Sequence, residues 1–269
     1  MLVKLLTYNI RHGFHSRDHI LQRKRLEAAQ RVIASENPDI AALTEACYGS
    51  LNSQGITMDY MALFKFRYGF FGGYPVYGRM KGYEGGNVLL SQHPMKAEVV
   101  PLINKSAIRA AISLDDNLLN VDVVHPSQAI DDRKKFEALQ PLLARRPSPY
   151  ILTGDFNALS PEDIYDKEQL LEEFQEFMGD TAETVIAELL KSRMIDQILT
   201  HGLRDAFEDK KKKDSTVPTR SKYGKSISGM RIDYFFVSND LKVENAYVLK
   251  NEDAEVASDH YPIVGVFHL

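Results

Sequence analysis

Cysteine is nearly absent from the sequence, and tryptophan is absent altogether. The single cysteine, Cys47, cannot form an internal disulfide and has no companions for a structural zinc site. A reducing compartment is therefore expected. No apolar run approaches the roughly 18 residues that a membrane span requires, and the first residues lack the apolar region of a secretion signal. We expect a cytoplasmic protein that is neither secreted nor inserted in a membrane.

The sequence also lacks a marked excess of one charge. Its 33 Lys and Arg residues nearly balance its 37 Asp and Glu residues, which leaves a net charge of −4. There is no overall basic field of the kind that drives non-specific nucleic-acid binding, so net charge neither favours nor excludes such a substrate. Hydrophobic residues make up 44% and charged residues 26% of the chain, which excludes a disordered, collagen-like or coiled-coil protein.

Short apolar runs alternate with amphipathic ones along the chain. Strands are predicted at residues 2–8, 39–44, 87–91, 97–103, 107–114, 118–124, 150–153, 232–237, 242–249 and 263–267. Helices are predicted at residues 16–36, at 131–145 and over most of 161–207. The Gly- and Tyr-rich residues 70–86 are predicted to be a loop system that could move over a site.

This order of elements favours two β-sheets that pack face to face and are covered by helices, rather than a doubly wound nucleotide-binding sheet. The short links between the strands of residues 87–124 imply antiparallel pairing. No linker-like segment divides the chain, so residues 1–269 are expected to form one domain.

Polar side chains recur within or just beyond the apolar runs. They are Asn9, Glu45, His125, Asp155, Asn157, Asp233, Asp259 and His260. Burying such groups costs several kcal/mol unless they are paired or bind a metal. Any one of them could merely cap a helix or turn, but the whole set favours a shared site where strand ends converge.

The sharpest local signal is the run Gly154-Asp155-Phe156-Asn157. Gly154 permits a tight turn after the strand, and Asp155 can orient a water or accept its proton. Asn157, two residues on, offers both a donor and an acceptor. A plain Asx turn is the alternative interpretation.

Asp259 and His260 are neighbours in the sequence, and neighbours on an extended chain point to opposite sides. We therefore expect Asp259 to face a cation and His260 to face a phosphate oxygen, with Asp233 as the carboxylate that orients His260. A surface aspartate and a core histidine are the alternatives.

Glu45 and His125 each follow an apolar run. Glu45 offers the hard oxygen ligand that Mg²⁺ or Mn²⁺ accepts, although a glutamate there could also face solvent. His125 could donate to a phosphate or to a leaving oxygen, or it could be a turn histidine before Pro126.

Several motifs, spread over nearly the whole chain, form an ordered pattern. They are Thr7-Tyr8-Asn9-Ile10-Arg11, Glu45, Gly86-Asn87-Val88-Leu89-Leu90-Ser91, His125, Gly154-Asp155-Phe156-Asn157, Arg231-Ile232-Asp233-Tyr234 and Ser258-Asp259-His260. The pattern resembles that of the endonuclease/exonuclease/phosphatase superfamily of metal-dependent phosphoesterases. That superfamily includes pancreatic-type deoxyribonuclease, abasic-site endonucleases, inositol polyphosphate 5-phosphatases, bacterial sphingomyelinases and deadenylases. An ordered set of matches is far more specific than any single one.

The resemblance implies an α/β fold, namely a four-layer α/β/β/α sandwich of two mixed, largely antiparallel sheets, with the active site at one edge. It also implies that Glu45 binds the divalent metal, Mg²⁺ or Mn²⁺. Asn9 and Asp259 would be further or water-mediated ligands of that metal.

The resemblance assigns the reaction itself to other residues. Asp155 would orient or deprotonate the attacking water, and Asn157 would hold the water and the phosphate. His260, oriented by Asp233, would stabilise charge on the phosphoryl oxygens, because phosphoryl transfer depends on positioning and charge neutralisation. His125 would contact the phosphate or assist the leaving group, and the remaining phosphate contacts would come from Arg11 and Asn87.

The chain departs from the family pattern at two positions. Arg11 stands where abasic-site nucleases usually carry an acidic residue, and Thr44 replaces the glutamine that commonly precedes the metal-binding glutamate. Without tryptophan, an aromatic wall for a flipped nucleotide would have to come from Tyr or Phe. Signatures of 5-phosphatases and sphingomyelinases are not evident, so the pattern predicts the family more closely than the substrate.

The predicted function is metal-dependent hydrolysis of phosphate esters, with phosphodiesters favoured over phosphomonoesters and no obligate protein partner evident. The substrate could be a nucleic acid or a lipid or sugar phosphate. A DNA or RNA nuclease is the alternative, for which the basic residues Lys210–Lys213, Arg220, Lys222 and Lys225 could follow a phosphate backbone. Such a run is more commonly a solvated loop. A non-catalytic binding module of the same fold is the alternative from another class, but binding alone does not require a water-activating group.

Overall fold

The computed structural model describes residues 1–16, 20–49, 59–74, 83–127, 131–191, 193–209, 214–219 and 229–269. Within these residues, two six-stranded sheets form the centre of the molecule. The first sheet has the order β11-β12-β1-β2-β4-β3, and the second has the order β5-β6-β7-β8-β10-β9. The first contains β1 (Leu2–Asn9), β2 (Ile40–Gly49), β3 (Tyr68–Gly73), β4 (Tyr83–Ser91), β11 (Lys242–Val248) and β12 (Ile263–His268). The second contains β5 (Met95–Pro101), β6 (Ser106–Leu114), β7 (Asn117–Val124), β8 (Tyr150–Asp155), β9 (Leu203–Asp205) and β10 (Asp233–Ser238).

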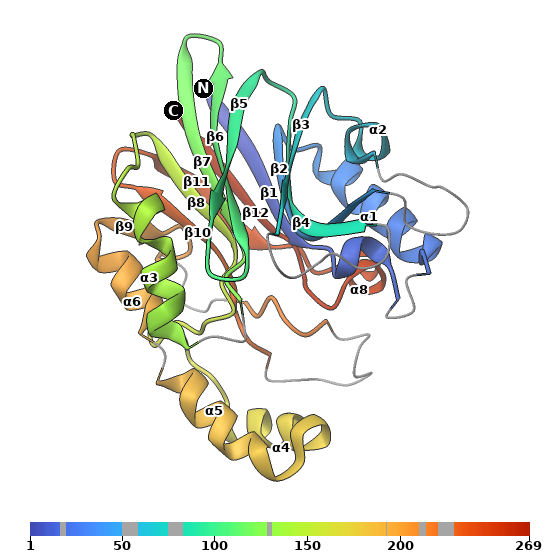
Figure 1. Ribbon diagram of the computed structural model, residues 1–269, viewed down its shortest axis with the longest axis vertical. Coiled ribbons are helices and arrows are strands. Elements are labelled where there is room, and N and C mark those ends of the chain that lie inside the picture. The colour runs from blue at the N-terminus through green and yellow to red at the C-terminus, as the bar shows by residue number, and fades with distance from the viewer. Residues whose placement is uncertain are drawn as a thin grey trace.

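Each sheet has one central parallel pair, β1 with β2 and β7 with β8, while its other strands pair antiparallel. Helices cover the outer faces: α1 (Arg23–Glu36) and α8 (Glu252–Ala257) lie on the first sheet, and α3 (Asp132–Leu143) and α6 (Met194–Thr200) lie on the second (Figure 1). The four-layer α/β/β/α sandwich predicted from the sequence is therefore confirmed.

The remaining helical segments lie partly within and partly outside these four layers. A short helix, α2 (Tyr60–Phe64), packs beside α1, whereas α4 (Lys167–Met178) and α5 (Ala182–Leu190) stand away from the sheets at the lower end of Figure 1. The 3-10 turns are η1 (His12–Phe14) and η2 (Gly179–Thr181).

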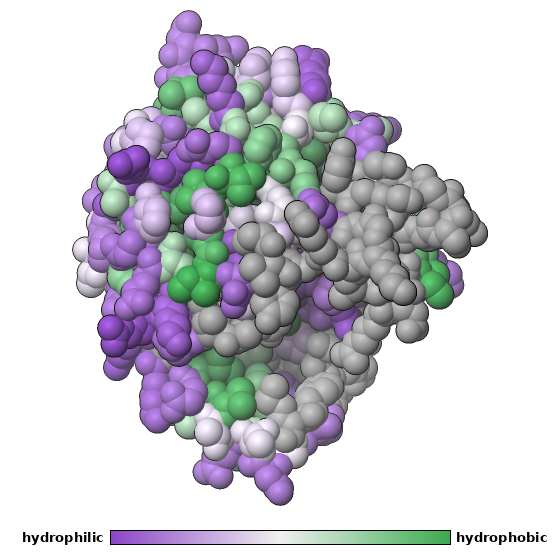
Figure 2. Space-filling model, viewed as in Figure 1, coloured by the Kyte–Doolittle hydropathy of each residue, from purple (hydrophilic) through white to green (hydrophobic). Residues whose placement is uncertain are grey.

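Hydrophilic residues dominate the described surface seen in Figure 2, with hydrophobic residues in small groups among them. In the described part of the chain, no helix is both long and apolar enough to cross a membrane.

The strands that carry polar residues at their ends are buried on both faces, so they are almost continuously apolar. Every residue of β8 and of β10 is buried. The polar exceptions pair across the two sheets: Thr7 Oγ1 lies 2.7 Å from Thr153 Oγ1, which donates to the Tyr234 carbonyl at 2.8 Å. Side chains on one face of a strand are two residues apart. Asn9, two residues after Thr7, and Asp155, two residues after Thr153, therefore also meet between β1 and β8.

Some element boundaries differ from those predicted. Helix α1 begins at Arg23, not at Ser16, since His15 and Leu21 form an isolated β-bridge before it. It ends at Glu36 as predicted, where Asn37 adopts a left-handed φ of 45° and its N–H bonds to the Ile33 carbonyl. The region 161–207 is mostly helical, as predicted, but it also contains the short strand β9.

The prediction of a loop system at residues 70–86 is wrong for the residues that the structure describes. Its ends belong to β3 and β4, which pair antiparallel, while residues 75–82 lie outside the described residues. A side chain at Gly86 would approach the Gly72 carbonyl oxygen within 2.4 Å. Glycine therefore serves the close approach of two strands there, not loop mobility.

Gly154 has a similar role. It lies inside β8 with a φ of +142°, and a Cβ at this position would lie 1.9 Å from the Val124 carbonyl oxygen. The strand thus continues through Gly154 and ends at Asp155, instead of turning at the glycine as the sequence suggested.

Candidate active site

Six strands bring their polar ends to one edge of the paired sheets. Asn9 ends β1 and Asp155 ends β8, while His125 directly follows β7. Strands β10 and β12 run in the opposite direction, so Asp233, which begins β10, and His260, which lies shortly before β12, arrive at the same edge. The site is assembled from segments that are up to about 250 positions apart in the chain.

Glu45 reaches this edge through a bulge within β2. The pairing register of β2 with β4 shifts between Leu43 and Ala46, and Glu45 itself has a φ of 53°. A bulge of this kind bends a strand and redirects a side chain. Glu45 Oε1 lies 3.2 Å from Asn9 Nδ2, and Oε2 accepts from the His12 N–H at 3.3 Å. Glu45 follows the apolar run, as the sequence showed, but the strand continues beyond it.

Asn9 joins two carboxylates. Its Oδ1 accepts from the Arg11 N–H at 2.9 Å, which fixes the orientation of the amide. Its Nδ2 therefore faces Glu45 Oε1 at 3.2 Å and Asp155 Oδ2 at 2.9 Å. Asn9 thus presents its NH₂ group, not its oxygen, to the site.

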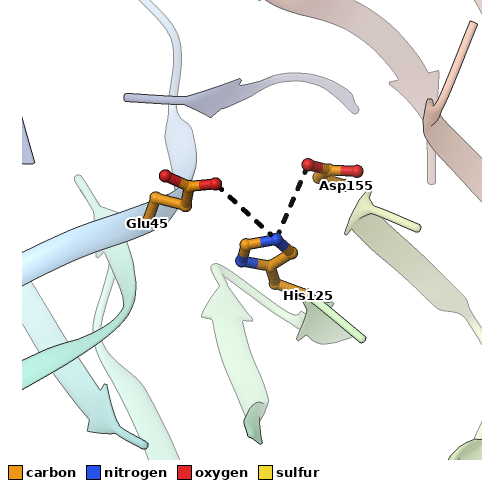
Figure 3. A group of neighbouring side chains, drawn as sticks. All are labelled: Glu45, His125 and Asp155. Carbon is orange, nitrogen blue, oxygen red and sulfur yellow. Dashed lines mark ion pairs between the residues drawn. The ribbon is translucent and has the colours of Figure 1, made fainter. Parts of the chain in front are cut away.

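His125 lies between the same two carboxylates. Its Nε2 is 3.9 Å from Glu45 Oε1 and 3.6 Å from Asp155 Oδ2 (Figure 3). Burial holds the pKa of His125 well below its usual value, and the positive charges of Lys105, His260 and His12 lower it further. The imidazole is therefore neutral at physiological pH.

His260 approaches Asp155 from the opposite side, with Nε2 3.9 Å from Asp155 Oδ2. Its Nδ1 lies 2.9 Å from Oδ2 of Asp233, the residue expected to orient it. Burial alone would lower the pKa of His260, but the charge and hydrogen bond of Asp233, with Asp155 and Asp259, raise it to about 10. His260 is therefore an imidazolium that can donate from Nε2.

Asp155 is the common neighbour of these groups. Burial, followed by the charge of Asp233, which is its direct cross-strand partner, raises the pKa of Asp155 to about 7. His260, the Asn157 N–H and Asn9 act in the opposite direction. A carboxyl group with a pKa near neutrality is suited to accept a proton from water.

Two groups of side chains have donor atoms close enough for one cation, each within 4.8 Å: Glu45, His125 and Asp155, and Asp155, Asp233 and His260. In the second group, the hydrogen bond between Asp233 and His260 already uses one donor pair. The first group combines two carboxylates with a neutral imidazole, and this donor set fits a divalent metal.

Comparison with known proteins identifies the family of the chain. The sequence model of the Endonuclease/Exonuclease/phosphatase family matches residues 6–260. The chain belongs to this family. No match was found among curated protein sequences.

Solved structures of the family share the fold. An endonuclease/exonuclease/phosphatase from Beutenbergia cavernae DSM 12333 aligns over 100% of this chain and 72% of its own, with 22% identity and a TM-score of 0.69. D. rerio TDP2 complexed with single strand DNA product covers 100% and 99%, with 15% identity and a TM-score of 0.62. ANGEL2, a 2',3'-cyclic phosphatase, in complex with adenosine-2',3'-vanadate covers 99% and 95%, with 14% identity and a TM-score of 0.62. At these identities the likeness shows the fold.

Asn157 combines the two interpretations that the sequence left open. Its N–H donates to Asp155 Oδ1 at 2.8 Å, which is an Asx turn, and its Nδ2 donates to the Pro126 carbonyl at 3.1 Å. Asp155 Oδ2 nevertheless faces Asn9 and the two histidines. The turn therefore orients the carboxylate toward the site.

The remaining residues that the family resemblance singled out lie at different depths. Arg11 Nε is 3.4 Å from Asp259 Oδ2 at the partly exposed rim, so these two residues face each other. Asn87 is fully buried and uses both ends of its amide: Nδ2 donates to the Ser106 carbonyl, and Oδ1 accepts from Tyr74. Asn87 thus lies behind His125, not in the position of a phosphate ligand.

Both departures from the family pattern lie at this edge. Arg11 belongs to a run of four residues, 11–14, with positive φ values of 42°, 55°, 56° and 67°, of which only Gly13 adopts them without strain. This turn brings the His12 N–H to Glu45. Thr44 is buried beside the bulge, and its Oγ1 has no hydrogen-bond partner among the described residues.

Sequence reasoning missed three residues near the site: Tyr74, Lys105 and His12. Tyr74 Oη lies 3.0 Å from His125 Nδ1, and Lys105 Nζ lies 4.1 Å from the centre of the Tyr74 ring. Burial lowers the pKa of Lys105, while Glu45 and Asp155 raise it, so the ammonium belongs to the charge balance of the site. None of the three follows an apolar run in the way that marked the other residues.

Proposed function

We propose that the protein is a divalent-metal-dependent hydrolase of phosphate esters, and of phosphodiesters in particular. The observation that carries the proposal is the environment of Asp155 Oδ2. This atom has the Glu45–His125 pair on one side and the imidazolium of His260 at 3.9 Å on the other. A base near neutrality, a cation site and a charged donor therefore meet around one small volume.

In the proposed mechanism, Asp155 Oδ2 orients the attacking water and accepts its proton. Asn157 holds the turn that positions Asp155, through its hydrogen bonds to Asp155 and to the Pro126 carbonyl. His260 donates from Nε2 to a phosphoryl oxygen, while Asp233 maintains its charge. A divalent metal, when bound, would supply positive charge beside the phosphate and lower the pKa of a water. Glu45 would hold it, with Asn9 keeping Glu45 and Asp155 in place. Water is the nucleophile throughout, so no covalent intermediate forms.

The preference for phosphodiesters follows from the charges at the site. The carboxylates of Glu45, Asp155, Asp233 and Asp259 lie at the site. They would repel the second negative charge of a monoester more than the single charge of a diester.

Similar structures support a phosphate-ester substrate. They include D. rerio TDP2 complexed with single strand DNA product and ANGEL2, a 2',3'-cyclic phosphatase. A nuclease acting on DNA or RNA is therefore the second candidate. The basic residues predicted to follow a nucleic-acid backbone, Lys210–Lys213, Arg220, Lys222 and Lys225, lie outside the described residues. Plasmid nicking that falls steeply with salt would favour the nuclease, and activity confined to small phosphodiesters would oppose it.

The test is turnover of bis-p-nitrophenyl phosphate with Mg²⁺ or Mn²⁺, with EDTA, and with metal restored after EDTA. We expect EDTA to abolish turnover reversibly. Asp155→Ala and His260→Ala are each expected to lower kcat by about two orders of magnitude or more while the protein stays folded. Asp253→Asn, which removes a surface carboxylate paired with Arg31, is the matched control. Equal turnover with and without EDTA would contradict the metal mechanism, and phosphate binding without turnover would favour a non-catalytic module.

A further inference from the structure

Two histidines direct the same ring nitrogen, Nε2, at the same carboxylate oxygen, Asp155 Oδ2. They differ in the partner of the other nitrogen. Nδ1 of His260 meets the carboxylate of Asp233 at 2.9 Å, whereas Nδ1 of His125 meets the hydroxyl of Tyr74 at 3.0 Å. A carboxylate favours the charged ring, and a hydroxyl does not. The two histidines therefore have different chemistry in the same geometry.

The direction of the hydrogen bonds behind His125 follows from an atom that can only accept, the Ser106 carbonyl oxygen. Asn87 Nδ2 donates to it at 2.9 Å, so Asn87 turns its Oδ1 toward Tyr74. Oδ1 can only accept, so the Tyr74 hydroxyl donates to it at 3.0 Å. That hydroxyl has a single proton, so it must accept from His125, and Nδ1 of His125 carries a hydrogen.

The neutral ring of His125 then has a bare Nε2. Its distances to the nearest carboxylate oxygens, 3.6 Å and 3.9 Å, are longer than hydrogen bonds, so no hydrogen bond from Nε2 to either carboxylate competes with this tautomer. Moving the hydrogen to Nε2 would require Tyr74 to donate to Nδ1, and Asn87 Oδ1 would then face a lone pair inside the protein.

We propose that Tyr74 is a positioning residue that holds neutral His125 in the Nδ1–H tautomer, and that the bare Nε2 joins Glu45 as a ligand for a divalent cation beside the proposed base Asp155. This inference rests on the proposed metal dependence, and it replaces the phosphate contact that the sequence suggested for His125. Histidine ligands of metals commonly donate their second N–H to an orienting partner. A nitrogen donor favours Mn²⁺ over Mg²⁺, which prefers oxygen ligands alone.

Long-range ¹H–¹⁵N correlation spectra of the metal-free protein, labelled on histidine nitrogen and recorded at about pH 8, read the tautomer directly. We expect a bare Nε2 on His125, whose signals are identified because they vanish in His125→Gln. His260 should carry hydrogen on both nitrogens. A proton on Nε2 of neutral His125 would overturn the proposal.

Calorimetric titration with MnCl₂ and with MgCl₂ measures the cation site without turnover. His125→Gln is expected to weaken Mn²⁺ binding by about tenfold or more, and Mg²⁺ binding by less. Tyr74→Phe keeps the ring beside Lys105 but removes the hydroxyl, so it should mix the tautomers of His125 and weaken Mn²⁺ binding by about tenfold. Tyr60→Phe is the matched control, because the Tyr60 hydroxyl is buried and bonded to the Cys47 backbone. It should change neither measurement.

The outcomes separate this inference from the proposed function. Metal-dependent turnover with unchanged Mn²⁺ affinity in His125→Gln would overturn the inference alone. The opposite result is also possible: His125 has a bare Nε2 and Mn²⁺ binding depends on it, but the protein turns over no phosphodiester. That result would support the inference and contradict the proposed function.

Discussion

Asp233→Asn tests whether the charge of His260 comes from its carboxylate partner. The substitution keeps the size and the acceptor of the side chain but removes its charge. Two unit charges 2.9 Å apart interact by about 6 kcal/mol at an effective dielectric constant of about 20, which corresponds to about 4 pKa units. The pKa of His260, which is about 10 in the native protein, should therefore fall to about 6.

This fall produces a loss of activity that depends on pH. At about pH 8, only about one His260 in a hundred would remain protonated in the variant, so kcat/KM should fall about 100-fold. At about pH 6, about half would be protonated, so the loss should be only about twofold. The measurement is the ratio of variant to wild-type kcat/KM on bis-p-nitrophenyl phosphate across this pH range, with Asp253→Asn as the control. A ratio that is the same at both pH values would refute the electrostatic argument, since Asp233 would then act through shape alone.

Two further predictions follow from Asp155 and its neighbour Gly154. Ionised Asp155 is the proposed base and its pKa is about 7, so activity should rise as pH increases through this value, and a saturating metal should move the rise to lower pH. A pH profile of kcat/KM that is flat between about pH 5 and 8 would contradict this role. Gly154→Ala places a Cβ 1.9 Å from the Val124 carbonyl oxygen and should cost more than about 4 kcal/mol in urea unfolding. Gly179→Ala, which meets nothing within 4 Å, should cost less, about 1–3 kcal/mol, from the positive φ of 55° alone.

The sequence predicted much of the fold because the central strands are buried on both sides. Such strands appear as continuous apolar runs, and the polar residue that ends each run is conspicuous. Asn9 and Asp155 end such runs, while Asp233 and His260 lie at or just before the start of others. The structure brings all four to one edge. The pairing of β1 with β8 through Thr7 and Thr153 explains why their ends coincide.

The glycines misled the interpretation of residues 70–86. Paired glycines are typical of loops, but Gly72 and Gly86 belong to adjacent strands, and a side chain on Gly86 would meet the Gly72 carbonyl oxygen. Whether a glycine frees the backbone or lets another strand approach depends on its partner strand, and a single sequence does not identify that partner. The bulge at Glu45 was invisible for the same reason, because a register shift exists only relative to β4.

The orientation of each side chain is a further step beyond its position. The sequence indicates that Asn9, Asn87 and His125 belong near the site, but an amide or an imidazole can present either a donor or an acceptor. The orientation is determined by backbone groups that can only donate or only accept. The Arg11 N–H, a donor, orients the Asn9 amide, and the Ser106 carbonyl, an acceptor, orients the Asn87 amide. Which backbone group faces which side chain depends on the strand register and on the left-handed turn at residues 11–14. A residue pattern can therefore predict which groups meet. Whether His125 contacts phosphate or binds a metal depends on its tautomer, which the Ser106 carbonyl, nineteen positions away, determines through Asn87 and Tyr74.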